Sequence, residues 1–186
     1  NILPTKLREE PLREGKGSTY EGGLREPCAV RWPGHVPAGH TSDAIFATID
    51  FLPTFGKLAG YEIPDDRIID GVDQTGLLTG KSETGAREDY FYFCKGELHA
   101  VRKGPWKLIL PDRKKFYGYV KDKGSQRAEL YNLTQDVSES EDQAKAHPEI
   151  VKELRTCADA LPLPDAPYDE RIRLNRPQPR KAKDGT

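Results

Sequence analysis

Several common features are scarce or absent in this chain of 186 residues. It has no methionine, and its three cysteines, Cys28, Cys94 and Cys157, form no C-x-x-C pair, which excludes a zinc ribbon or a thioredoxin-type motif. We interpret them as small buried or half-buried thiols. No apolar run reaches the roughly 18 residues of a membrane-spanning helix. The net charge of −1 argues against a nucleic-acid-binding protein, because such proteins usually carry a basic surface.

The length and composition suit one domain or a large subdomain. Apolar residues make up 35% and charged residues 32% of the chain, which allows one hydrophobic core but not a second independent one. The chain starts at Asn1 without methionine, and we recognise no signal peptide in it. We therefore expect either a processed protein or a piece of a longer one.

The first half of the chain predicts the end of an α/β sheet. Short apolar runs at residues 28–32 and 44–49 predict two buried strands. Asp50 is expected to cap a helix that ends at Gly60, with apolar residues at helical spacing between them. One further helical turn is expected near Leu77, and residues 1–89 are assigned to the C-terminal end of a main α/β domain.

The second half predicts a small α+β subdomain over residues 90–161. Five strand-like runs follow one another without intervening helices, which predicts an antiparallel meander. They lie at residues 90–94, 98–102, 106–110, 116–120 and 129–133. A one-faced helix that starts at Pro148 is expected to pack on this sheet. Residues 162–186 hold five prolines and six Lys or Arg and are expected to form a disordered tail.

The chemically informative segment is GKGSTYEGG, from Gly15 to Gly23. A lysine between two glycines sits on a backbone that can fold tightly, so the Lys16 ammonium can serve as a fixed charge for a sulfate or phosphate ester. The GxxxxGK[ST] order of a P-loop is absent. The competing interpretation is a surface lysine in a flexible loop. Glu21 and Arg25 are expected to form a local ion pair that shapes this segment.

Six blocks between residues 12 and 160 resemble the C-terminal third of type I, arylsulfatase-like sulfatases. They are LREGKGSTYEGGLREP, VRWPGH, DFLPT with LAG, IDGVD, AVRKGPWKL and ELYNL, followed by HPE before the last helix. Their order and spacing agree with the family, which makes the resemblance more specific than any single block.

The resemblance implies a main domain like that of alkaline phosphatase and a sulfuric ester hydrolase activity. Such enzymes use a formylglycine, made from Cys or Ser in a C/S-x-P-x-R motif, beside a divalent cation, usually calcium. None of the three cysteines here has a proline two positions on, so the nucleophile is not in this chain. We expect the chain alone to bind no metal and to be inactive.

Three residues are candidates for the active site. Lys16 matches the sulfate-contacting lysine of the family and is the one expected catalytic residue. Arg25 and His99 are further candidates for substrate binding, since the small sheet borders the active-site cleft in the family. For Arg25 the ion pair with Glu21 is the favoured alternative, and for His99 it is a side chain that faces water at the rim of the sheet.

The expected partners are a sulfated carbohydrate or an aryl sulfate, and the missing N-terminal sulfatase portion, with no nucleic acid and no membrane. By resemblance the protein is expected to be exported, as a periplasmic, extracellular or lysosomal enzyme. Two alternatives stay open. One is a phosphate or phosphonate ester hydrolase of the same superfamily, and the other is a separately encoded, non-catalytic module that binds a carbohydrate or a partner chain.

Overall fold

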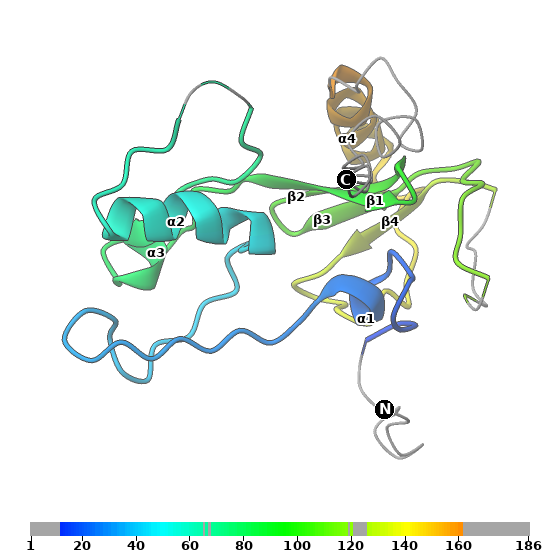
Figure 1. Ribbon diagram of the computed structural model, residues 1–186. Coiled ribbons are helices and arrows are strands. Elements are labelled where there is room, and N and C mark those ends of the chain that lie inside the picture. The colour runs from blue at the N-terminus through cyan, green and yellow to red at the C-terminus, as the bar shows by residue number, and fades with distance from the viewer. Residues whose placement is uncertain (1–11, 65, 67, 119, 121–125, 162–186) are drawn as a thin grey trace, which may run out of the picture.

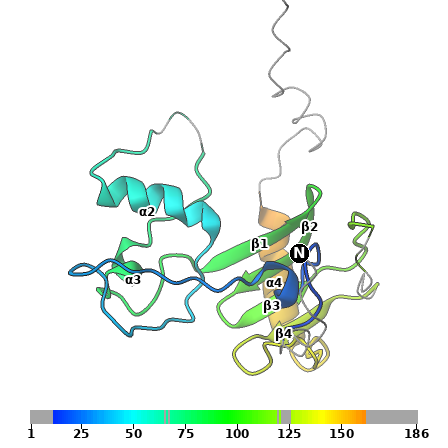
Figure 2. The same ribbon diagram turned by 60° about the horizontal axis from the view of Figure 1, so that its bottom comes forward.

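The computed structural model describes residues 12–64, 66, 68–118, 120 and 126–161 (Figure 1). The expected tail at 162–186 lies outside these residues. A four-stranded sheet lies between a long C-terminal helix on one side and the N-terminal segment, with one short helix, on the other (Figure 1). Two further helices lie beside the sheet rather than on either face (Figure 2). No helix in the described ranges has the length and apolar character needed to span a bilayer.

The predicted antiparallel meander is confirmed. Strands β1 (Asp89–Cys94), β2 (Glu97–Lys103), β3 (Trp106–Ile109) and β4 (Glu129–Asn132) pair in the order β1-β2-β3-β4. A two-residue turn joins β1 to β2, and both of its residues have positive φ, as the right-handed twist of a hairpin favours: Lys95 at 50° and Gly96 at 76°. The fifth expected strand, at 116–120, is wrong for its described residues, which form no strand.

The two faces of the sheet carry different cores because successive side chains on a strand point in opposite directions. One face buries Tyr92, Ala100, Ile109 and Tyr131 together with Tyr20 of the N-terminal segment. The other face packs against helix α4, and its buried members are Val101, Leu108, Leu130, Leu154 and Ala158. Helix α4 (Pro148–Ala160) begins with proline at its first position, as predicted.

The two strands expected in the first half are wrong. Residues 28–32 are extended without strand pairing and are exposed, and residues 44–47 are also irregular. A short 3₁₀ helix, η2 (Thr48–Asp50), then leads into helix α2 (Phe51–Leu58). The expected helix is thus confirmed, with Gly60 at φ 70° just after it. The helical turn expected near Leu77 is α3 (Thr75–Leu78).

Asp50 stands at the predicted N-cap position of α2, but the expectation that its side chain caps the helix is wrong. Its side chain makes no capping bond to α2; instead Oδ2 accepts from the backbone N–H of Ala47 at 2.8 Å, and Oδ1 accepts from that of Val72 at 2.9 Å. Arg87, just before β1, completes a buried ion pair with the same carboxylate. Burial raises the pKa of Asp50, but these hydrogen bonds outweigh it and hold the pKa below its usual value. Asp50 therefore ties α2 to the start of the sheet.

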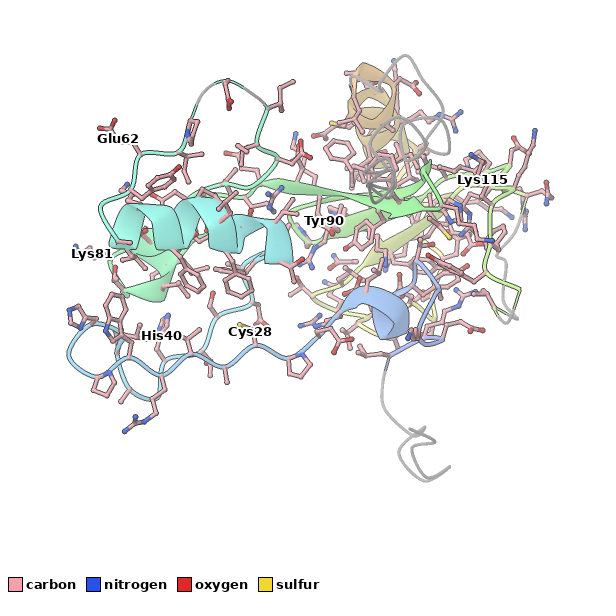
Figure 3. All side chains as sticks on the ribbon, in the orientation of Figure 1. Cys28, His40, Glu62, Lys81, Tyr90 and Lys115 are labelled. Carbon is pink, nitrogen blue, oxygen red and sulfur yellow. The ribbon has the colours of Figure 1, made fainter. Side chains whose placement is uncertain are left out.

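All three cysteines are free. Cys94 is buried and Cys157 half-buried, as expected, but Cys28 is exposed on the extended segment that runs past α2 (Figure 3). The expectation of three buried or half-buried thiols is wrong for Cys28 because no neighbouring strand covers this segment.

Candidate functional site

The glycine-rich segment folds into a compact turn that leads into helix α1 (Glu21–Leu24). The backbone N–H of Ser18 donates to the carbonyl of Gly15 at 3.1 Å, and that of Gly22 donates to the carbonyl of Arg13 at 2.9 Å. Gly17 has φ 91°, a conformation that glycine adopts without strain. The segment is therefore an ordered loop and not the flexible loop of the competing interpretation.

Two further glycines are required because the loop packs against its own backbone. A Cβ atom on Gly22 would lie 2.4 Å from the carbonyl oxygen of Glu14, and one on Gly23 would lie 2.2 Å from that of Ser18. Gly15, in contrast, has open space where a Cβ would stand. The glycine spacing of the motif thus follows from close approach of two backbone segments.

Lys16 stands at the exposed tip of this loop. The residues that follow it, from Ser18 to Glu21, are buried against the sheet. The loop therefore presents the Lys16 ammonium at the surface from a base that is fixed on the sheet, and such a point charge suits an oxyanion.

Below the loop lies a buried cluster of charges, here called the Lys107 cluster: Lys107 of β3, Glu21 of α1 and Glu139 of the turn after β4. The Lys107 Nζ lies 2.9 Å from Glu21 Oε1 and 2.9 Å from Glu139 Oε1, and 4.5 Å from the centre of the Tyr92 ring. Lys107 and Glu139 have 0% of their side chains exposed, and Glu21 has 3%. Burial raises the pKa of Glu139, and its contacts with Lys107 and Glu21 offset this only in part.

Arg13 holds the other end of the loop. Its Nη1 donates to the Tyr131 hydroxyl at 2.8 Å and to the backbone carbonyl of Glu139 at 3.1 Å, and its guanidinium stacks 3.8 Å over the Tyr20 ring. The Tyr20 hydroxyl donates to Glu129 Oε2 at 3.0 Å. The loop is thus fixed to β4 both before and after Lys16.

Arg25 forms the predicted ion pair with Glu21, at 3.8 Å between Nη1 and Oε2. Its Nη2 also lies 3.7 Å from Asp43, and its side chain is 40% exposed. The much shorter contact of Glu21 with Lys107 was not predicted. The substrate-binding role of Arg25 stays a prediction.

His99 does not face water; its side chain is 1% exposed, so that expectation is wrong. It occupies the bulge of β2, opposite the shift between Tyr92 and Phe93. Its Nε2 lies 2.9 Å from Glu97 Oε2, and burial lowers its pKa despite this carboxylate. The Nδ1 of His99 and the Nε and Nη2 of the nearby Arg113 are buried and find no hydrogen-bond partner among the described residues. Substrate binding by His99 stays a prediction.

Lys16, Arg25 and His99 make no hydrogen bond or ion pair with one another in the described part of the chain. Arg113 links two of these regions, since its Nη1 lies 3.5 Å from the Thr19 hydroxyl and its charge acts on the His99 ring. Sequence reasoning missed Arg113, Glu139 and the burial of Lys107. The family block AVRKGPWKL, which contains Lys107, was the available signal for that residue.

No cluster of three or more His, Cys, Asp or Glu side chains suited to a metal ion occurs among the described residues. The sequence also has no C/S-x-P-x-R motif. The described residues therefore offer no ligand set for the calcium of a sulfatase, and the sequence offers no residue for its formylglycine.

An apolar surface covers the part of the chain beside the sheet. A shallow groove of about 390 Å³ runs between the extended segment and α2, lined by Val30, Trp32, Val36, Phe55, Leu58, Ala59 and Leu78. Leu52 and Phe55 on α2 are more than half exposed, at 56% and 53%. A patch of this kind on a soluble domain usually marks a contact surface.

The sequence profile of the family described as N-sulphoglucosamine sulphohydrolase, C-terminal, matches residues 15–161. The chain belongs to this family. Rat arylsulfatase G is 35% identical over 161 residues, which cover 78% of this chain and 30% of that protein. The N-acetylgalactosamine-6-O-sulfatase of Bacteroides thetaiotaomicron is 36% identical over 148 residues, which cover 76% of this chain and 28% of that protein.

A solved structure from work on glycosaminoglycan metabolism by Bacteroides thetaiotaomicron superposes on the chain with a TM-score of 0.70. It shares 34% sequence identity, and the match covers 81% of this chain and 32% of that one. These relatives are sulfatases, and the sulfatase resemblance and the small antiparallel sheet with its C-terminal helix are both confirmed. The chain spans about 30% of the length of these relatives.

Proposed function

We propose that this chain is the C-terminal part of a sulfatase that hydrolyses a sulfate ester, and that Lys16 holds the sulfate group. The observation that carries the proposal is an exposed lysine on a loop whose base is buried and hydrogen-bonded on both sides. A preorganised positive charge stabilises the negative charge on the oxygens of the sulfuryl group under attack, without having to reorganise during the reaction.

The remaining chemistry belongs to groups outside this chain. By resemblance, a formylglycine and a divalent cation, calcium in most of the family, would supply the covalent nucleophile and a second positive charge in the longer protein. The contribution of this chain is to orient the sulfate from one side through Lys16. Arg25, whose guanidinium is partly exposed beside Asp43, is proposed to approach the substrate from the same loop. His99, which lies in the bulge of β2 beside Arg113, is also proposed to contribute to substrate binding.

A sulfated carbohydrate is the proposed substrate class. Two relatives support it, since one is named for N-acetylgalactosamine 6-O-sulfate and one comes from work on glycosaminoglycans. An aryl sulfate is the second candidate, in keeping with rat arylsulfatase G. Export to the periplasm, the cell exterior or a lysosome is proposed on the same resemblance.

The preceding part of the sulfatase fold is the proposed partner of the apolar surface around α2. Burying exposed side chains such as Leu52, Phe55 and Trp32 would stabilise that contact by about 25 cal/mol for each Å² removed from water. A separately encoded binding module, in contrast, would keep this surface in water unless its partner chain covers it. A reading frame that continues upstream and contains C/S-x-P-x-R supports the enzyme, and a start codon directly before Asn1 supports the module.

The phosphate or phosphonate ester hydrolase differs from a sulfatase in its nucleophile. Mass spectrometry of the natural protein decides between them, because a sulfatase carries formylglycine where the phosphate-ester enzyme keeps Thr or unmodified Cys. The chain alone is proposed to be inactive. Turnover of an aryl sulfate by the purified chain with calcium contradicts this.

The role of Lys16 is tested in a chimeric sulfatase, in which residues 15–161 replace the matching segment of the Bacteroides thetaiotaomicron N-acetylgalactosamine-6-O-sulfatase. We expect Lys16→Ala to lower kcat/KM about 10²–10³-fold, the range for one lost charge-stabilising donor. Lys16→Arg should retain more activity because it keeps the charge. Lys81→Ala is the control, because this lysine is also exposed but lies near α3, outside the glycine-rich loop (Figure 3). Equal activity of the Lys16→Ala and Lys81→Ala enzymes contradicts the proposal.

A further inference from the structure

We propose that Lys107 and Glu139 are positioning residues for Lys16: their buried ion pair fixes the glycine-rich loop on the sheet at the place where Lys16 meets the sulfate. The inference rests on the proposed function of Lys16. Neither residue touches the sulfate in this account; both act through the loop.

The contacts run from the sheet to the loop without a break. Lys107 projects from β3 onto the face that the loop covers, beside Tyr131 of β4 in the register. Its Nζ lies 2.9 Å from a carboxylate oxygen of Glu21, the first residue of α1. Glu21 comes directly after the buried run that follows Lys16, so the position of Lys107 determines where this end of the loop lies.

Glu139 attaches the backbone at the end of the loop, and not only a side chain, to Lys107. One oxygen, Oε1, lies 2.9 Å from Lys107 Nζ, and the other, Oε2, accepts from the backbone N–H of Glu21 at 2.6 Å. A carboxylate shared between a side-chain cation and a backbone N–H fixes the backbone itself, which an apolar contact does not do. The backbone carbonyl of Glu139 also accepts from Arg13, so the same residue holds the loop on both sides of Lys16.

The turn that carries Glu139 is itself held in place. Asp136 accepts hydrogen bonds from the Ser138 hydroxyl at 2.8 Å and from the backbone N–H groups of Ser140 and Glu141 at 2.7 and 2.8 Å. Glu139 stands in the middle of this turn with φ 52°, a conformation that a non-glycine residue adopts only when its surroundings impose it. The turn after β4 thus supports the Lys107 cluster and, through it, the loop.

A buried ion pair is weak evidence for stability, because replacing all of its partners together by apolar residues of similar volume is often as stable. It is a better explanation of a fixed geometry, since each charge must meet its partners at defined distances. An ion pair on the other face of the sheet offers a matched control. Lys103 Nζ lies 2.7 Å from Glu153 Oε1, but both side chains are exposed and neither touches the loop.

The test is a double-mutant cycle in the chimeric sulfatase, with kcat and KM measured per folded molecule. In the Lys16 background, Lys107→Met should lower kcat/KM about ten- to a hundredfold, the cost of misplacing a binding group by about 1 Å. In the Lys16→Ala background the same change should have less than about twofold effect, because no ammonium remains to be misplaced. Lys103→Met should leave kcat/KM unchanged in both backgrounds.

Milder variants keep the test informative if Lys107→Met folds poorly. Glu139→Gln retains an acceptor for the Glu21 N–H and should keep more activity than Glu139→Ala. An equal loss from Lys107→Met in both Lys16 backgrounds overturns the inference, and so does unchanged activity per folded molecule.

A second measurement separates this inference from the proposed function. In the full chain, Lys107→Met should speed hydrogen exchange at the Ser18 and Gly22 amides, which close the loop, while β2 stays protected. Unchanged exchange at these amides overturns the positioning role. If Lys16→Ala leaves the activity of the chimera intact although this exchange changes as expected, the proposed function of Lys16 is the part that fails.

Discussion

Replacing Lys107 by methionine should destabilise the chain far more than replacing any exposed lysine. Methionine matches the lysine stem in shape but leaves the carboxylates of Glu21 and Glu139 buried without the cation that lies 2.9 Å from each. Breaking a buried ion pair by removing one partner costs about 3–5 kcal/mol. The control Lys103→Met breaks a pair at 2.7 Å whose side chains are both exposed, so solvent screens it and its loss should cost far less.

The loss of stability caused by Lys107→Met should become smaller as the pH falls. Without Lys107 the pKa of a buried carboxyl lies above its unfolded value, so the folded variant binds more protons than the unfolded chain. The stability of Lys107→Met should therefore rise relative to the wild type as the pH falls from about 8 to about 5. A triple variant, Lys107→Met with Glu21→Gln and Glu139→Gln, removes the buried charges and should show no such recovery.

Urea unfolding followed by tryptophan fluorescence measures the free energy of unfolding of each variant at each pH, since Trp106 lies next to Lys107 in β3. The reasoning is refuted if Lys107→Met shifts the free energy of unfolding no more than Lys103→Met does. It is also refuted if the difference between Lys107→Met and the wild type does not depend on pH.

Three further outcomes are expected. Gly23→Ala should lower the free energy of unfolding in urea by about 1–3 kcal/mol, because the new Cβ would clash with the Ser18 carbonyl. Gly15→Ala, where the Cβ has open space, should lower it by less than about 1 kcal/mol. Equal effects of the two changes would contradict the close packing of the loop. Burial lowers the pKa of His99, so stability should fall as the pH drops below about 6.5, by at most about 1.4 kcal/mol per pH unit. His99→Gln should remove that slope while Glu97 and Arg113 remain, and an unchanged slope contradicts it. In the isolated chain, the amides of residues 28–32 should exchange nearly as fast as in an unfolded chain while β2 and β3 stay protected; strong protection of 28–32 contradicts the exposed apolar surface.

The elements predicted well from the sequence are those whose signals are local. The side chains of β1 to β4 alternate between two buried faces, and turn residues such as Gly96 separate the strands. Helix α4 is indicated by Pro148 at its start and by its single apolar face. The expected strands at 28–32 and 44–49 failed for a physical reason. A strand forms only where a neighbouring strand supplies hydrogen-bond partners, and a short apolar run does not reveal whether one is present.

The candidate site could be predicted only in part for a similar reason. Lys16 was identified from its glycine neighbours and the family resemblance. Lys107 lies between Trp106 and Leu108, where strand alternation gives a lysine the pattern of a solvent-facing residue. Its partner Glu21 lies 86 residues away, so their contact exists only in the folded chain. His99 was misjudged because its ring packs on Phe116, with 4.9 Å between the ring centres, and lies near Arg113, and the sequence does not show that the segment after β3 folds back onto it.

The most direct test of the account is a crystal structure of the chimeric sulfatase with sulfate bound. The account predicts the Lys16 Nζ within about 3 Å of a sulfate oxygen, with the Lys107 cluster intact beneath the loop. A sulfate held entirely by other side chains, with Lys16 directed into solvent, would contradict it.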